Sequence, residues 1–298
     1  MTPKISVVIN TLNEEQNIER AIKSVSWADE LIVCDMHSED KTVEIAKKLG
    51  AKIFFHKKED FVELARNFAI SKATNEWILI LDADEEIPDT LGNKIKEIAS
   101  QGIVDFVNIP RKNIIFGHFM QYSGWWPDFN IRFFKKDNVK WFNKIHRPPE
   151  TTGKGFDLPA EEGCAIIHQS YATISQFLKR MDRYTTVQAS ELKQEGYVFA
   201  WKDLFQKASG EFLSRFFANK GYKDGMHGLA LSFLQAFSFI VMYLKVWEME
   251  KFKEQKIELS EIDSQKNKIN KAIDYWIKQV GDQGNFFKRI FKKVDRRC

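Results

Sequence analysis

Strand-like and helix-like segments alternate along the first 81 residues, and this alternation limits the fold more than any other feature of the 298-residue chain. The strand-like runs are continuous and apolar, which is typical of strands buried on both faces of a parallel sheet. The predicted strands are 5–9, 31–34, 51–55 and 77–81, and the predicted helices between them are 15–25, 41–49 and 61–73. Four strands joined by crossover helices predict a right-handed α/β sheet with helices on both faces.

Polar residues follow three of these predicted strands. Asn10 ends the first run, Asp35 follows the second, and an acidic segment, 82–85, follows the fourth. Ligands of open α/β sheets bind at the carboxyl ends of the strands. We therefore expect these residues to converge on one ligand-binding edge.

The acidic segment carries the sharpest signal. Asp82 and Asp84 are two residues apart at the end of a buried strand, so alternation places both on one side, about 7 Å apart along the chain. Mg²⁺ and Mn²⁺ take oxygen ligands, often one or two carboxylates together with substrate phosphates. The pair is therefore suited to a metal-bound diphosphate, whereas an isolated pair of this kind is as readily a turn with solvated acids.

Four segments in this order resemble the family-two glycosyltransferases with the A-type fold, and among them the lipopolysaccharide-core β-1,4-glucosyltransferase branch. They are 5–15, which contains a T-x-N-E turn, 35–42 (DMHSEDKT), 65–69 (ARNFA) and 127–134 (PDFNIRFF). The resemblance covers about residues 4–171 by motif and the later helices more weakly. It implies a Rossmann-like, mostly parallel central sheet followed by a helical C-terminal region.

The resemblance also implies roles at the donor site. Asp35 would accept a hydrogen bond from the uracil imide, and Asp82 would reach the ribose or the donor sugar. Asp84 would bind a divalent metal, Mn²⁺ or Mg²⁺, and Arg66 would offset diphosphate charge, although it can equally pair with a nearby acid. The other expected nucleotide-sugar-binding residues are Asn10, Leu12, Asn13, Glu14 and Ala83.

An inverting sugar transfer needs a carboxylate that takes a proton from the acceptor hydroxyl. The segment 127–134 resembles the branch's P-D-x-x-x-R-L-F, with phenylalanine in place of its leucine, so Asp128 is the expected general base. An aspartate that caps a turn after proline is the alternative. His146 is the expected second metal ligand, and His168 is the other candidate, because arginine follows His146 where the branch has glutamate.

The C-terminal half is almost wholly helical in pattern, and we divide the chain into 1–172, 173–247 and 248–298. Residues 225–244 carry no formal charge, so they could span a membrane, form a core or oligomer helix, or lie at a membrane surface. Residues 252–280 follow a heptad pattern with seven of nine seam positions apolar. This pattern predicts a long helix that packs on its own chain or mediates self-association.

The charge is unevenly distributed. Lys and Arg number 45 against 41 Asp and Glu, and the net charge of +4 comes entirely from residues 248–298. Residues 286–298 alone hold six basic residues and one acid, with apolar residues on the opposite face of the predicted helix. This pattern is typical of a helix that binds an anionic membrane surface, although a basic helix can instead bind a calmodulin-like protein or nucleic acid, or simply be solvated. For the chain as a whole, the small net charge argues against a nucleic-acid partner.

Three cysteines without a CxxC pair exclude a disulfide framework, and no signal-peptide pattern is found at the N-terminus. We expect a cytoplasmic protein that associates peripherally with the inner face of the cell membrane. The sequence favours an inverting, metal-dependent transfer of a hexose, glucose from UDP-glucose, to a membrane glycolipid saccharide such as a lipopolysaccharide core. The alternatives are transfer to a polyprenyl phosphate or a protein, or a non-catalytic module that binds sugar nucleotides or glycans.

Overall fold

The computed structural model describes residues 3–59, 62–142 and 148–294, and gives the backbone alone for residues 63 and 282–294. The chain forms two compact units. The first contains residues up to Ile115 and the range Trp126–Ser170, and the second contains Phe116–Trp125 and everything from Tyr171 onward. Residues 116–125 thus belong to the second unit, which also holds both 173–247 and 248–298.

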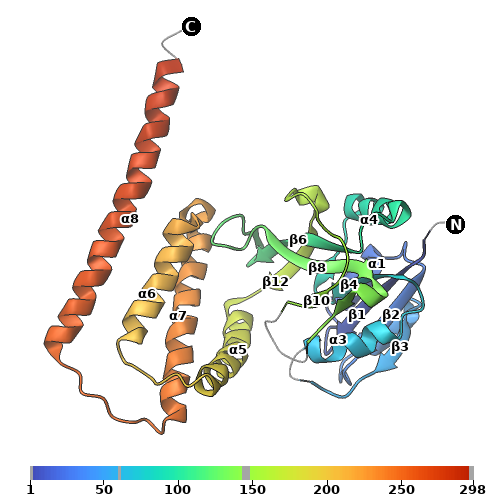
Figure 1. Cartoon of the computed structure of the whole chain (residues 1–298), viewed down its shortest axis with the longest axis horizontal. Coiled ribbons are helices and arrows are strands. Elements are labelled where there is room, and N and C mark those ends of the chain that lie inside the picture. The colour runs from blue at the N-terminus through green and yellow to red at the C-terminus, as the bar shows by residue number, and fades with distance from the viewer. Residues whose placement is uncertain (1–2, 60–61, 143–147, 295–298) are drawn as a thin grey trace. The chain divides into compact units, whose positions relative to one another are not determined.

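Four parallel strands form one half of the first unit's sheet, in the order β3-β2-β1-β4. They are β1 (Ile5–Thr11), β2 (Glu30–Asp35), β3 (Lys52–Phe55) and β4 (Trp77–Asp82). Every residue of β1 is buried, as its continuous apolar run predicts. Figure 1 shows these strands side by side, and the α/β fold expected from the alternating pattern is confirmed.

The other half of the sheet is largely antiparallel. β8 (Asp128–Lys135) pairs antiparallel with both β4 and β6 (Phe106–Ile115), and β12 (Ile166–Tyr171) lies between β6 and β5 (Glu85–Glu86). The short strand β11 (Gly155–Asp157) also pairs with β6, and β9 (Val139–Lys140) forms a separate ribbon with β10 (Glu150–Thr151). The two-residue strand β7 (His118–Phe119) belongs to the second unit. Two of these pairings matter for the site: Arg111 lies opposite Asp128, and His168 lies opposite Glu85.

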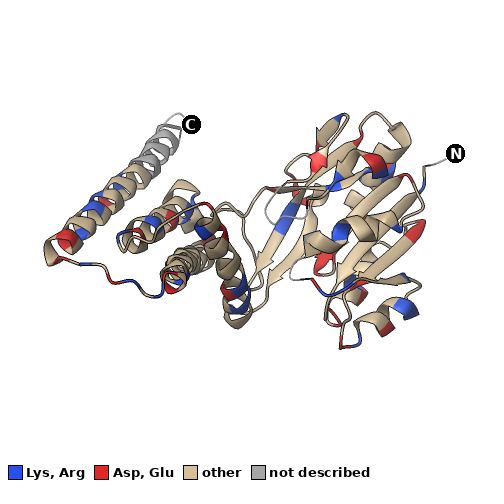
Figure 2. Ribbon diagram, turned by 60° about the horizontal axis from the view of Figure 1, so that its bottom comes forward, with Lys and Arg blue, Asp and Glu red and all other residues tan. Residues whose placement is uncertain are grey.

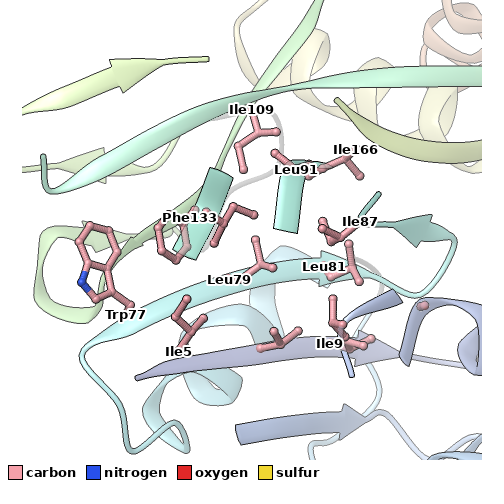
Figure 3. Close-up of a cluster of buried hydrophobic side chains, with 14 of the residues drawn as sticks. Ile5, Ile9, Trp77, Leu79, Leu81, Ile87, Leu91, Ile109, Phe133 and Ile166 are labelled. Carbon is pink, nitrogen blue, oxygen red and sulfur yellow. The ribbon is translucent and has the colours of Figure 1, made fainter. Parts of the chain in front are cut away.

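Apolar residues cover both faces of this sheet. On one face, Val7 and Leu79 pack with residues of α1 (Ile18–Ser24), α2 (Thr42–Lys48) and α4 (Asp89–Gln101). Figure 3 shows this cluster, in which the rings of Trp77 and Phe133 stack 4.6 Å apart. On the other face, Val8 packs with residues of α3 (Val62–Ser71). Helices on both faces leave the strand ends free to carry the site.

Helix α1 begins at Ile18, three residues later than the sequence pattern predicts. The residues before it form a turn in which Asn13 has a φ of 56°. The backbone N–H groups of Asn13 and Glu14 donate to the hydroxyls of Ser38 and Thr42 instead of starting a helix. Side-chain partners 25 to 28 residues away therefore override the local helical pattern.

The second unit is helical and contains α5 (Ile174–Gln194), α6 (Asp203–Leu213), α7 (Gly225–Met249) and α8 (Leu259–Val294). A π-helical turn, η3 (Ser214–Ala218), and a 3₁₀ turn, η4 (Gly221–Asp224), join α6 to α7. Phe199, Tyr243 and Val246 belong to the core cluster of this unit. The loop 116–125 is held here, because the Asp224 carboxylate accepts the backbone N–H groups of Gln121 and Tyr122.

The helix α8 starts at Leu259, so the first predicted heptad, 252–258, is not helical. The Gln255 side chain instead bonds the backbone of Phe199 and Trp201, which fixes this segment as a connector. Beyond it, α8 packs along α6 through Gln265, whose amide accepts a hydrogen bond from Gln206 at 2.9 Å. Self-association through α8 stays a prediction.

Within the described residues, Gly221–Met249 is long and apolar enough to cross a membrane, with a mean hydropathy of 1.8. A third of its most apolar window is buried inside the protein. Leu231, Met242 and Val246 face the other helices, whereas Phe233 and Phe237 are 59% and 46% exposed. Length and composition alone therefore do not distinguish a span from a helix that packs on one side.

Candidate active site

The two loops that begin the site are locked together by hydrogen bonds. The turn after β1 donates backbone N–H groups to Ser38 and Thr42 in the loop after β2. In return, the Asn13 side-chain oxygen accepts the backbone N–H of Glu39 at 2.8 Å. The two sequence motifs thus build one structure, in which Asn13 and Glu14 set the shape of the loops.

Asp35 lies at the base of these loops and is fully buried. One carboxylate oxygen accepts the Ser38 backbone N–H at 2.8 Å, and the other accepts the hydroxyls of Ser38 at 2.5 Å and Thr11 at 3.2 Å. The structure therefore places Asp35 where it shapes the expected base-binding loop. Its direct contact with uracil stays a prediction.

The buried side chain of Asn10 lacks hydrogen-bond partners among the described residues at this edge of the sheet. Its side chain is 5% exposed, and neither Nδ2 nor Oδ1 has a hydrogen-bond partner among the described residues. Buried amides without partners are costly, so such a group fits a bound polar ligand. Asn10 lies opposite Asp82 in the sheet, Leu12 follows it in the same turn, and Ala83 is buried beside the acidic pair.

Asp82 is held by two arginines. Arg66 donates to one carboxylate oxygen at 3.0 Å and Arg132 to the other at 2.6 Å. Burial alone would raise the pKa of Asp82, but Arg132 and Arg66 outweigh it and hold that pKa far below its usual range. Arg66 Nε and Arg132 Nε and Nη1 are buried and lack partners within the described ranges, which suits an additional anion.

A row of alternating charges runs from this pair to Asp128, and we call it the charged row. Arg132 also donates to Glu85 at 2.9 Å, and Glu85 in turn lies 3.4 Å from Arg111 Nη1. Three guanidinium groups alternate with three carboxylates, so the row is neutral as a whole. In order, its members are Arg66, Asp82, Arg132, Glu85, Arg111 and Asp128.

Asp128 ends the charged row. Its Oδ2 accepts two hydrogen bonds from Arg111, at 2.9 and 2.6 Å, and one from Asn113 at 3.2 Å. Among the described residues, its Oδ1 accepts one bond, from Asn130 at 3.1 Å. Burial would raise the pKa of Asp128, but Arg111 and the two amides lower it below its usual value. The carboxylate is ionised, and its Oδ1 accepts fewer hydrogen bonds from the described residues than its Oδ2 does.

Asp84 lies beside His168. The Asp84 Oδ2 and His168 Nε2 atoms are 3.6 Å apart, and both residues are 8% exposed. The antiparallel pairing of β5 with β12 brings them together, and the Gln169 backbone N–H donates to the Asp84 carbonyl. The other expected ligand, His146, lies outside the described residues.

A carboxylate and an imidazole form a donor set that suits Mn²⁺. Within the described ranges, no group of three His, Cys, Asp or Glu side chains could hold a metal ion by itself. Such a pair therefore fits a metal that also takes oxygen ligands from a bound diphosphate, as Mg²⁺ and Mn²⁺ commonly do in phosphate sites.

Sequence patterns did not identify Arg111 or Asn113 as site residues, and they placed Glu85 in the acidic segment without giving it a role. Arg111 and Asn113 are two residues apart on β6, so alternation puts both on the face that meets Asp128. The sequence offers one signal for these two residues, namely a polar pair within a strand that is otherwise rich in buried apolar residues. This signal points to the site only once the register between β6 and β8 is known.

The parallel half-sheet, its antiparallel extension and the acidic pair at their shared edge define a glycosyltransferase with the A-type fold. The chain belongs to glycosyltransferase family 2. The model of "Glycosyl transferase family 2" matches residues 6–153. An uncharacterized glycosyltransferase of Rickettsia typhi is 32% identical over 257 residues, which cover 83% of this chain and 87% of that protein.

Another uncharacterized glycosyltransferase, of Rickettsia felis, is 30% identical over 278 residues, which cover 90% of this chain and 98% of that protein. Among solved structures, a mannosyltransferase of Pyrobaculum calidifontis in complex with GDP-Man and Mn²⁺ has a TM-score of 0.46 and 15% identity. That match covers 86% of this chain and 77% of the mannosyltransferase. The expected family is confirmed, and the lipopolysaccharide-core branch stays a prediction.

Proposed function

We propose that this glycosyltransferase is a metal-dependent, inverting hexosyltransferase that moves glucose from UDP-glucose to a saccharide of a membrane glycolipid, such as a lipopolysaccharide core. The observation that carries the proposal is that Asp84, paired with His168, and Asp128, held by Arg111, lie in one unit at the ends of paired strands. A metal-binding pair and a fixed carboxylate base are the two groups that such a transfer requires.

The donor would be held by the loops after β1 and β2. The unpartnered Asn10 amide supports a polar group of the nucleoside there, and Asp35 keeps the loop in shape. The N–H groups of Arg66 and Arg132 that have no partner in the described part of the chain support an anionic diphosphate beside Asp82. Because both guanidinium groups are fixed by Asp82, they bind the diphosphate without first losing side-chain freedom.

Asp84 and His168 would hold the divalent cation, together with oxygens of the diphosphate. When bound, the cation offsets the negative charge that develops on the departing UDP. Asp84 and His168 fix its position because each is buried and placed by the β5–β12 pairing. His146 stays a further candidate ligand.

Asp128 would act as the general base. Its Oδ1 takes the proton of the acceptor hydroxyl as that oxygen attacks the anomeric carbon of the donor sugar. The bond from the anomeric carbon to the phosphate oxygen breaks, and UDP leaves with its electron pair. Attack on the side opposite the leaving group inverts the anomeric configuration.

The helical unit supports a membrane-associated acceptor. Five large apolar residues of α7 are exposed, and four of them recur at helical spacing: Met226, Phe233, Phe237 and Leu244. Figure 2 shows charges of both signs interspersed along the described part of α8. In the sequence, the surplus positive charge is densest in residues 286–298. An apolar helix face and a basic tail together are the features of a peripheral membrane protein, which contacts anionic lipid.

The test is a screen of UDP-sugars for UDP release, with Mn²⁺, Mg²⁺ or a chelator, in the presence and absence of membrane lipid extract. We expect UDP-glucose to give the highest metal-dependent release and lipid extract to increase it. Metal-independent release would contradict the metal assignment, and an unchanged rate with lipid would contradict a glycolipid acceptor.

A further inference from the structure

Asn113 connects the two halves of the candidate active site. It lies on β6, is 1% exposed, and its Nδ2 donates to Asp128 Oδ2 at 3.2 Å. Its Oδ1 lies 2.6 Å from Nδ1 of His168. One buried amide therefore touches both the expected base and the histidine that faces Asp84.

These contacts fix the orientation of the amide and the tautomer of the histidine. An ionised carboxylate only accepts hydrogen bonds, so the NH₂ group of Asn113 must face Asp128. The amide oxygen then faces His168 and only accepts, so His168 Nδ1 carries a hydrogen. In the neutral ring, Nε2 is left with its lone pair, 3.6 Å from Asp84 Oδ2.

When the ring is neutral, these two acceptor atoms repel each other, and the repulsion is removed by a metal ion between them or by a second ring proton on Nε2. A histidine that binds a metal through Nε2 is commonly held by a hydrogen bond from its Nδ1 to a neighbouring oxygen. The Asn113 oxygen provides such an acceptor, and the opposite end of the same amide restrains Oδ2 of the base. Oδ1 of Asp128 is thereby left for the acceptor hydroxyl.

We propose that Asn113 is a positioning residue that serves metal binding and proton transfer at once. It keeps His168 in the metal-binding tautomer and keeps Asp128 turned so that Oδ1 receives the proton. This inference rests on the proposed function. If Asn113 only satisfied hydrogen bonds in the core, replacing it would lower the stability of the protein and leave the affinity of the folded protein for the metal unchanged.

Two substitutions separate the two roles. Asn113→Ala removes both contacts, so Mn²⁺ affinity falls by roughly 10–100-fold and kcat falls with it. Asn113→Asp keeps an oxygen that accepts from His168 Nδ1 but has no NH₂ group for Asp128. Its Mn²⁺ affinity therefore stays close to that of the wild type, while kcat falls on the order of tenfold or more.

The experiment measures free Mn²⁺ by electron paramagnetic resonance during titration of the full chain in the presence of UDP, and kcat for UDP release in parallel. Asn130→Ala is a matched control for the base, because Asn130 contacts Asp128 and not His168 in the described structure. It should lower kcat and leave Mn²⁺ affinity unchanged. Asn108→Ala, also on β6, removes only a bond to Asp157 and should change neither.

Folded Asn113→Ala protein with wild-type Mn²⁺ affinity and kcat would overturn the role of Asn113. Equal losses of Mn²⁺ affinity in Asn113→Asp and Asn113→Ala would overturn the tautomer assignment, and Asn113→Asp decides this point even if Asn113→Ala does not fold. Wild-type protein that binds no Mn²⁺ with UDP would overturn the proposed function as well. Wild-type binding combined with unaffected Asn113 variants would overturn this inference alone.

Discussion

Arg111 determines both where the Asp128 carboxylate lies and how readily it takes a proton. Two of its nitrogens donate to Oδ2, which fixes the carboxylate in one orientation. Burial raises the pKa of Asp128, but the positive charge and hydrogen bonds of Arg111, together with the hydrogen bonds of Asn113 and Asn130, outweigh it. A base must be ionised to act, so a lowered pKa keeps Asp128 active at more acidic pH.

Replacing Arg111 should therefore move the pH dependence of the enzyme. In Arg111→Gln, only the hydrogen bonds of Asn113 and Asn130 still oppose the effect of burial. The pKa of Asp128 therefore rises, and the acidic limb of the kcat/KM profile moves to higher pH. Lys112→Gln is the matched control, since the neighbouring lysine pairs with Glu162 at the surface. An acidic limb that stays in place in Arg111→Gln would contradict the assignment of Asp128 as base.

Removal of the base or of the metal ligand should have larger effects. Asp128→Asn should lower kcat by about 10²–10⁴-fold, the usual contribution of a general base. Asp84→Ala should abolish metal-dependent donor turnover, because one of the two proposed metal-binding side chains, Asp84 and His168, is lost. Both are measured as UDP release with Mn²⁺ present. Near-normal turnover in Asp84→Ala would rule out the metal assignment.

Glu30 shows how a buried carboxylate contributes to stability away from the site. It is 6% exposed, and its oxygens accept from Ser6, Lys52 and the Thr74 backbone. Burial would raise the pKa of Glu30, but these donors lower it from 4.5 to about 2. Since the folded-state pKa is depressed, the stabilisation is present above pH 4.5 and is lost as the pH falls toward 2.

Glu30→Gln should therefore reduce the free energy of unfolding by about 1–3 kcal/mol at pH 7, because an NH₂ group replaces one of the two oxygens that accept these hydrogen bonds and so faces a donor. Its stability should also vary less with pH than that of the wild type between pH 4.5 and 2. Urea denaturation at a series of pH values measures both effects. Glu97→Gln, which removes an exposed pair with Lys94, should change little.

At the scale of elements, the sequence itself shows where the parallel strands lie, whereas the pairing of the antiparallel strands is not visible in it. Strands β1 and β4 are buried on both faces and have unbroken apolar runs, so burial is visible in the sequence itself. Strand β5 has two residues, Glu85 and Glu86, and exists because β12 pairs with it. Its role in bringing His168 to Asp84 depends on contacts more than 80 residues apart, which no local pattern encodes.

The same contrast applies to the site. Asp84 and Asp128 stand in recognisable motifs, whereas the importance of Arg111 and Asn113 follows from the register of β6 against β8. A bulge between Val107 and Asn108 shifts that register. Since one extra residue exchanges the two faces of a strand, the alternation of β6 alone could not show which residues meet Asp128.

At the junction of η4 and α7 the two backbone segments lie so close together that they limit the size of the side chain at Gly228. A Cβ atom on Gly228 would overlap the carbonyl oxygen of Gly221, whereas one on Gly210 in α6 would have nothing within 4 Å. Gly228→Ala should therefore lower the free energy of unfolding by about 1–3 kcal/mol, the usual cost of overpacking.

Gly210→Ala is the matched control and should raise the same free energy by roughly 0.5–1 kcal/mol, since alanine favours a helix. Urea denaturation monitored by helical circular dichroism measures both variants. A Gly228→Ala protein as stable as Gly210→Ala would show that α7 and η4 can move apart at little cost.

At the scale of the whole molecule, the net charge of +4 is less informative than its location. Residues 1–247 carry equal numbers of acidic and basic side chains, as suits a catalytic region whose charged row is neutral and whose anionic donor is met by a few fixed groups. The excess lies in residues 248–298, and most densely in 286–298. A neutral enzyme with a basic end is suited to an acceptor at an anionic surface.

Deleting residues 286–298 should weaken binding to vesicles that contain anionic lipid while leaving metal-dependent hydrolysis of the UDP-sugar intact. Each basic residue near such a surface contributes about 1 kcal/mol, so removing an excess of five should reduce sedimentation with anionic vesicles at least tenfold.

Vesicles of zwitterionic lipid serve as the control for apolar binding by α7. A full-length protein in which Lys288, Arg289, Lys292 and Lys293 are replaced by glutamine separates the two contributions, because it keeps the apolar residues of the tail. Equal sedimentation of the full-length and shortened chains with anionic vesicles would disprove the anchor and leave α7 as the remaining membrane contact to test.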